Sequence, residues 1–166
     1  MNVPKAIELA MAKIIRQYAE IGEGVTIRAW QSLAADGSWD EEKDRTFPLI
    51  DIRCGPPQTD ENQSTLMVDC SVVMATNADD DKSHAFISDM YEAVQDVCDS
   101  LFSKFRSGDE SESPLSDFLA LVTEETAAGA FGFGGLTFGQ GLPPADDAGA
   151  NIIGITLNVH YSRADF

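Results

Sequence analysis

The stretch whose spacing most suggests chemistry is Gly132-Phe133-Gly134-Gly135, because glycine-rich loops can wrap phosphate groups with their backbone amides. A dinucleotide-binding loop needs a strand before the glycines and a helix that begins at them. Here further glycines and then Pro143-Pro144 follow, and the lysine of a phosphate-binding loop is missing. The sequence therefore predicts no nucleotide site, and it carries no motif for any other cofactor.

Two other interpretations of this stretch stay open. It could be a flexible loop or glycine-bearing hairpin, or it could be a loop that becomes ordered when it contacts a partner protein. The second interpretation rests on Phe131, Phe133 and Phe138, because phenylalanines exposed among glycines are unfavourable unless a partner covers them. We predict these three residues as protein-contact residues.

Trp39 has a similar pair of interpretations, since it stands beside the acidic residues Asp40, Glu41 and Glu42. Tryptophan is enriched in binding hot spots, so this side chain could anchor an interface. It could equally fold back onto its own sheet. We include Trp39 and the three acids among the candidate protein-contact residues.

Residue types that bind metals or attack substrates occur, but their positions do not favour chemistry. Asp79–Asp81 and His84 stand where acids favour the positive end of a helix dipole. Cys70 falls on the apolar face of an expected strand and His160 on the polar face of another, so no nucleophile–base pair is expected. No two carboxylates lie among apolar residues, as general acid–base catalysis needs. We predict no metal site, no catalytic residues and no enzymatic activity.

The elements that position these residues follow from the spacing of apolar side chains. Apolar residues at helical spacing predict two main helices, and Ser113-Pro114 favours the start of a short third one. Alternation of apolar and polar residues predicts four strands. The two main helices cover Pro4–Tyr18 and His84–Phe105, and the strands cover Val25–Trp30, Phe47–Cys54, Leu66–Thr76 and Ile153–Tyr161.

Strands and helices do not alternate regularly along the chain, which argues against a doubly wound parallel sheet. We predict an α+β fold, in which a mainly antiparallel sheet of about four strands has two main helices packed on one face. The chain of 166 residues has the size of one domain, so we expect a single domain over residues 1–166. Flexible loops are expected near residues 32–46, 107–113 and 129–150.

The strong negative charge limits the partners that the protein can have. Asp and Glu total 28 against 11 Lys and Arg, which gives a formal net charge of −17. Binding to nucleic acid requires basic side chains that replace counterions on phosphates, and anionic membranes attract basic segments. We therefore expect neither direct nucleic-acid binding nor membrane association. Cys54, Cys70 and Cys98 are widely spaced, and we expect them to be reduced and buried.

Four parts of the chain carry a resemblance to a known family. A helix at Pro4–Tyr18 precedes the first strand, and a strand beginning Phe47-Pro48-Leu49-Ile50 follows a polar excursion. The alternating strand at Met67–Val73 leads through a polar turn into the long helix, and Ile153–Tyr161 closes the fold. In this layout the chain resembles the phage tail terminator family, also called tail completion or minor tail proteins. The glycine- and phenylalanine-rich stretch and the Trp39 loop do not match a family pattern.

The resemblance implies an α+β domain that assembles with copies of itself into a ring, which in the family is a hexamer. It further implies that the ring caps the tail tube and joins the tail to the head, so that the partners are the tail tube protein and a neck or head-completion protein. The location would be the virion, and the host cytoplasm during assembly. A different class of function also fits the charge: an acidic binding module, of the DNA-mimic or inhibitor type, that acts on a basic protein.

Overall fold

A computed structural model of the protein describes residues 2–22, 24–31, 47–59, 65–77, 83–107, 113–126, 131–147 and 149–163. Its helices are α1 (Val3–Tyr18), α4 (Ser83–Ser107) and α5 (Pro114–Thr126). Its strands are β1 (Thr26–Ala29), β2 (Leu49–Cys54), β3 (Gln58–Thr59), β4 (Leu66–Asn77), β5 (Phe131–Phe138), β6 (Ala145–Asp147) and β7 (Ala150–Arg163).

All seven strands belong to one sheet, in which the main path runs β1-β2-β4-β7-β5. β1 pairs with β2 in parallel, and the other described pairings are antiparallel. β3 lies along β4 beyond the end of β2, and β6 lies along β7 beyond the end of β5. β3 therefore continues the sheet in line with β2, and β6 continues it in line with β5, so neither strand widens the sheet.

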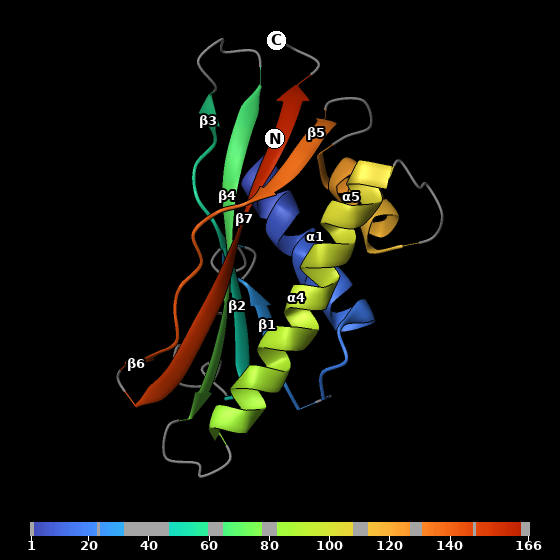
Figure 1. The fold of residues 1–166 in the computed structure, drawn as a ribbon. Helices are drawn as coiled ribbons and strands as arrows, with labels where there is room; N and C mark the ends of the chain where they lie inside the picture. Colours follow the sequence, from blue (N-terminus) through green and yellow to red (C-terminus); the bar gives the residue numbers. More distant parts are fainter. Residues whose placement is uncertain are drawn as a thin grey trace.

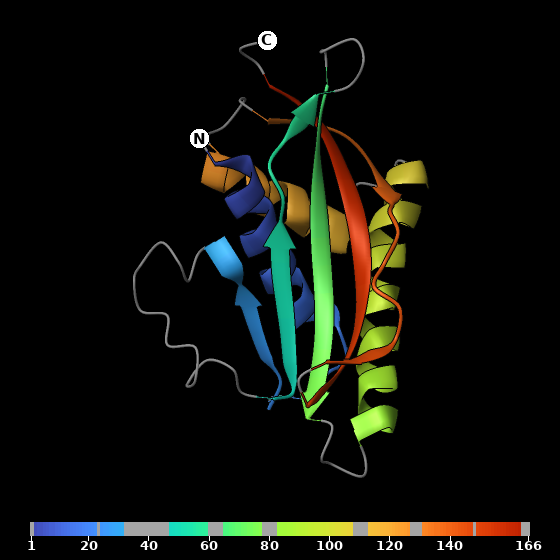
Figure 2. The same ribbon diagram turned by 90° about the vertical axis from the view of Figure 1, so that its left-hand side faces the viewer.

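The helices lie together on one face of the sheet, as Figure 1 shows from the side. In Figure 2, turned by 90°, the sheet stands in front and the helices lie behind it. α1 packs against β1, β2 and α5, while α4 runs along β4, β7 and β5. No described helix covers the other face of the sheet, so the fold has two layers with one core between them.

Local sequence explains where α1 begins and which side it buries. The Asn2 side chain accepts a hydrogen bond from the backbone N–H of Lys5 at 3.0 Å and caps the first turn, in which Pro4 is tolerated because that turn needs no internal donor. Apolar side chains then recur at helical spacing and are buried, as Ile7, Met11 and Ile14 are. This stripe attaches α1 to the sheet and to α5.

The two long central strands show the alternation that the sequence predicts. Cys70 and Val72 of β4 face the helices and are fully buried, opposite Leu157 and Ile155 of β7. The residues between them, such as Ser71, point to the other face and are only half-buried or exposed. Alternating side chains thus place one row of each strand in the core.

The predicted α+β class is confirmed, and the four predicted strands correspond to β1, β2, β4 and β7. The predicted number of strands is too low, because the described sheet has seven. The described helices are the two predicted main helices and α5, the short helix expected after Ser113-Pro114. β3 and β6 have two and three residues, too few for a periodic pattern to show.

The expected flexible loop at residues 129–150 is wrong over much of its length, because β5 and β6 lie within it. Glycine allows the pairing of β5 with β7. A Cβ at position 132 would lie 2.7 Å from the Ser162 hydroxyl, and Gly135, at a bulge in the ladder, has φ +149°. A side chain is strained at such a φ, so the glycines that suggest a loop instead fit an irregular strand.

The other two expected loops cannot be compared in the same way. Residues 32–46 lie outside the described residues, as do residues 108–112 of the expected loop at 107–113. Ser107 ends α4, and Ser113 precedes α5, where its hydroxyl accepts a hydrogen bond from the backbone N–H of Ser116 at 3.4 Å. This contact caps α5 at the residue where the sequence predicts a helix start.

Candidate functional site

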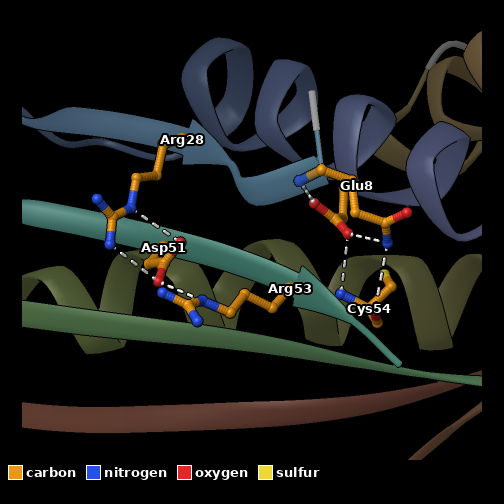
Figure 3. A network of polar contacts seen from close by, with 6 residues as sticks. Glu8, Arg28, Asp51, Arg53 and Cys54 are labelled. Atoms are coloured by element: carbon orange, nitrogen blue, oxygen red, sulfur yellow. Dashed lines mark hydrogen bonds and ion pairs between the residues drawn. The ribbon is translucent and has the colours of Figure 1, made fainter. Parts of the chain in front are cut away.

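A buried carboxylate joins α1 to the ends of β1 and β2. Glu8 is fully buried and accepts hydrogen bonds from the backbone N–H groups of Gln31 at 2.8 Å and Cys54 at 3.1 Å, as Figure 3 shows for Cys54. The Gln31 side chain also donates to it. Burial raises the pKa of Glu8, and these hydrogen bonds act in the opposite direction. The arrangement holds three elements together and presents no reacting group to solvent.

A second polar cluster lies on the sheet next to the first. The Arg28 guanidinium donates to the Asp51 carboxylate at 3.0 and 3.3 Å, and Arg53 donates to the same carboxylate at 2.8 Å (Figure 3). Arg28 and Asp51 are buried, whereas the Arg53 side chain is 53% exposed and lies 5.3 Å from the centre of the Trp30 ring. Trp30 itself is 42% exposed. This cluster presents an arginine stacked on a tryptophan, two residue types enriched in protein interfaces.

In the part of the chain that the structure describes, no group of three or more His, Cys, Asp or Glu side chains converges as a metal site requires. Cys54, Cys70 and Cys98 are free thiols. Burial, with a smaller contribution from Cys70, raises the pKa of Cys98 to about 12, so this thiol stays protonated at neutral pH.

The phenylalanines of β5 pack against the protein's own helices. Phe133 is half-buried, with its ring centre 5.2 Å from that of Phe105 in α4 and 6.2 Å from that of Phe118 in α5. Phe138 lies 5.7 Å from Phe102 of α4 and remains 43% exposed. Of the predicted contact residues, Phe138 therefore still offers a large apolar surface, while Phe133 serves mainly to attach β5.

The remaining predicted contact residues are less well placed. Phe131 begins β5, opposite Arg163 of β7. Trp39, Asp40, Glu41 and Glu42 lie outside the described residues, so the choice between an interface anchor and a residue folded onto its own sheet stays a prediction. Of these candidates, the structure thus places Phe131, Phe133 and Phe138 along one strand, β5.

Two grooves of similar size flank α4, and sequence reasoning did not identify either. On the α1 side, a groove of about 430 Å³ is lined by the acidic residues Glu20, Asp89, Glu92 and Asp96, with Tyr18 at its wall. The helix supplies three of these acids at positions i, i+3 and i+7, which share one side of a helix. This spacing of acidic residues is present in the sequence, but it indicates a groove only when the solvent-facing side of α4 is known.

On the opposite side of α4, a groove of about 400 Å³ lies between the start of the helix and the β6–β7 hairpin. Its lining is mainly apolar and includes Ile87, Tyr91, Pro144 and Ile153, with Asp146 among the polar residues. The α4 residues and the hairpin residues are more than 50 positions apart in the sequence, so no local pattern could have indicated the groove. It is a candidate site for an apolar segment of a partner protein.

Comparison with known proteins adds no identification. No protein-family model matches the chain, and no curated protein matches it either. Of the helices that the structure describes, none combines the length and the apolar character that crossing a bilayer requires.

Proposed function

We propose that this protein is an assembly subunit of the phage tail terminator type. In this proposal, copies of the chain form a ring, expected to be a hexamer, that caps the tail tube and joins it to the neck. The observation that carries the proposal is the order of elements: α1, β1, β2, β4, α4 and β7 follow one another in the layout on which the resemblance to that family rests. The helices on one face of a mainly antiparallel sheet are consistent with it.

The sheet offers surfaces on which copies could assemble. β1 and β5 form its two edges, and in the described residues no strand pairs with their outer sides. Edge strands carry backbone groups that can hydrogen-bond to another chain. Next to β1, the exposed Trp30 and its stacked Arg53 add a side-chain contact that suits an interface.

The charge agrees with a ring through which DNA passes without being held. A net charge of −17 makes the surface repel phosphate, so we expect no binding of duplex DNA at physiological salt. An electrophoretic shift assay with duplex DNA tests this expectation. A saturable, salt-sensitive shift would contradict it.

A second candidate function rests on the acidic groove. Asp89, Glu92 and Asp96 of α4 and Glu20, which follows α1, line this groove and form a surface that a basic protein could cover. This is the acidic binding module that the composition also favours. It predicts a heterologous complex with a basic protein and no assembly of the chain with itself.

The two functions respond to salt in opposite directions. Assembly of identical chains of charge −17 is opposed by repulsion, which salt screens over about 10 Å at 0.1 M, so self-assembly should strengthen as ionic strength rises. Binding of a basic partner is driven by attraction and should weaken as ionic strength rises. Negative-stain electron microscopy of the concentrated protein at low and high salt should show closed rings, more of them at high salt. If only unassembled single chains are seen at both salt concentrations, the proposal is contradicted.

A further inference from the structure

The pairing of β2 with β4 places two cysteines opposite each other. Cys54 is the last residue of β2, and its partner in the antiparallel ladder is Cys70 of β4. The neighbouring backbone N–H of Gly55 donates to the carbonyl oxygen of Asp69 at 2.9 Å. A hydrogen bond at that position identifies Cys54 and Cys70 as a non-hydrogen-bonded pair, the type in which opposite side chains approach most closely.

The spacing of such a pair suits a disulfide. Opposite Cα atoms of a non-hydrogen-bonded pair are about 4.5 Å apart, and disulfides join Cα atoms at about 4.4–6.8 Å. Both thiols are free, and they are near enough for Cys70 to raise the pKa of Cys54. Joining them therefore requires rotation of side chains and little movement of the backbone.

The two thiols differ in access. Cys70 is fully buried, whereas Cys54 is half-buried at the end of its strand, so a small molecule would reach Cys54 first. The third thiol, Cys98, is fully buried on α4, and its electrostatic interaction with Cys70 contributes to its raised pKa. Cys98 belongs to another layer of the fold and is not part of the cross-strand pair.

We propose that Cys54 and Cys70 form an oxidation site, which takes a low-molecular-weight disulfide as its oxidant and becomes a cross-strand disulfide. The Cys54 thiolate attacks one sulfur of the small disulfide, a mixed disulfide forms, and the first small thiol leaves with the proton that Cys54 lost. The Cys70 thiolate then attacks the Cys54 sulfur and displaces the second small thiol. Two protein thiols are oxidised, and one small disulfide is reduced to two thiols.

The surroundings make this reaction slow at neutral pH. The hydrogen bond with Cys70, burial, and the nearby carboxylates of Glu8 and Asp69 all raise the pKa of Cys54. Little thiolate is therefore present, and the rate should increase as pH rises. Once formed, the disulfide closes the chain between β2 and β4, which limits the unfolded state and should raise the urea concentration at which the protein unfolds.

The test uses the full-length, reduced, folded protein incubated with oxidised glutathione at about pH 8, where the thiolate fraction is larger than at neutrality. We expect the intact mass to fall by that of two hydrogen atoms, with one free thiol remaining of the three. Proteolysis after Glu61, which lies between the two cysteines in the sequence, should then release a disulfide-linked pair of peptides containing Cys54 and Cys70.

Single substitutions assign the disulfide. Cys98→Ser should leave the mass change and the linked peptides intact, and Cys54→Ser, at the less buried position, should abolish both while the circular dichroism stays that of the wild type. Cys70→Ala is a second variant with the same expected loss. The proposal would be overturned if the folded protein keeps three free thiols, if Cys54 stops at the glutathione adduct, or if the linked peptides contain Cys98.

Discussion

On its β5 side, α4 is covered by aromatic rings from an edge strand and borders a mainly apolar groove; on its α1 side, the same helix lines a groove with carboxylates. The two grooves have similar volumes, about 400 and 430 Å³. Their chemistry differs because Tyr91 and Phe102 face one way, while Asp89, Glu92 and Asp96 face the other. One helix thus separates a surface that suits apolar contacts from one that suits a basic partner.

The difference shows how a chain with a net charge of −17 can still fold. Acidic side chains on α4 are placed where water can solvate them, and the aromatic side supplies the apolar packing that attaches β5. The one carboxylate that is fully buried, among those described, is Glu8, and it is held by backbone N–H groups. Substitutions on the aromatic side of α4 should therefore change the free energy of unfolding strongly, and substitutions on its acidic side should change it weakly.

The largest expected effect is on the aromatic side. Phe118→Ala removes a fully buried ring that packs against Phe133, and a loss of about 3–5 kcal/mol in the free energy of unfolding is expected. Phe105→Ala, which removes a ring 39% exposed against the same Phe133, is the matched control and should cost clearly less. Urea unfolding measures both. Equal losses in the two variants would show that burial of Phe118 does not anchor this side.

The second prediction concerns Glu8, which is buried, unlike the solvated acids of α4. Glu8→Leu leaves the N–H groups of Gln31 and Cys54 without their acceptor, at about 1–3 kcal/mol for each group. Because burial raises the pKa of Glu8 in the folded state above its ordinary 4.5, the folded state binds a proton more tightly than the unfolded state. Wild-type stability should therefore fall as pH rises from about 4.5 through the raised pKa.

Glu8→Gln is the control for this pH dependence, because it keeps an acceptor oxygen but cannot ionise. Urea unfolding across the same pH range should show a flatter profile in Glu8→Gln than in the wild type. If the free energy of unfolding changes with pH in the same way in both proteins, the ionisation of Glu8 does not cause the pH dependence.

A smaller effect tests the contact between β5 and α4 directly. Phe102→Ala and Phe138→Ala, made singly and together, should show a coupling of about 0.5–1.5 kcal/mol in the free energy of unfolding, since the rings are 5.7 Å apart. Phe138→Ala combined with Glu92→Gln, on the other side of α4, should be additive. Additivity in both pairs would mean that Phe138 is not held by α4 and is free for a partner.

The smallest effect is on the acidic side. Glu92 lies three residues after Asp89 and four before Asp96, and each like-charged pair at these spacings destabilises a helix by roughly 0.2–0.5 kcal/mol. Glu92→Gln should therefore stabilise the protein slightly at low salt, and the gain should disappear at high salt. A loss of stability instead would show that this carboxylate makes a favourable contact in the folded protein.

Sequence periodicity was sufficient for the long elements and insufficient for the edge of the sheet. β4 and β7 alternate clearly, and α1 and α4 carry apolar stripes, so their residues could be assigned from spacing alone. β5 could not, because glycines occupy positions that would otherwise show the alternation. Its pairing also depends on residues of β7 that follow 19 to 32 positions later in the sequence. The grooves beside α4 likewise arise from segments that are distant in the sequence.

The proposal that the protein assembles with itself is tested most directly by its mass in solution, measured by light scattering over a wide concentration range at low and high salt. Assembly into a hexamer predicts that the mass rises from 17.9 kDa toward six times that value as concentration and salt increase. A mass of one chain at every concentration and at both salt levels would contradict it. In that event, the acidic groove beside α4 and a basic partner would become the better explanation.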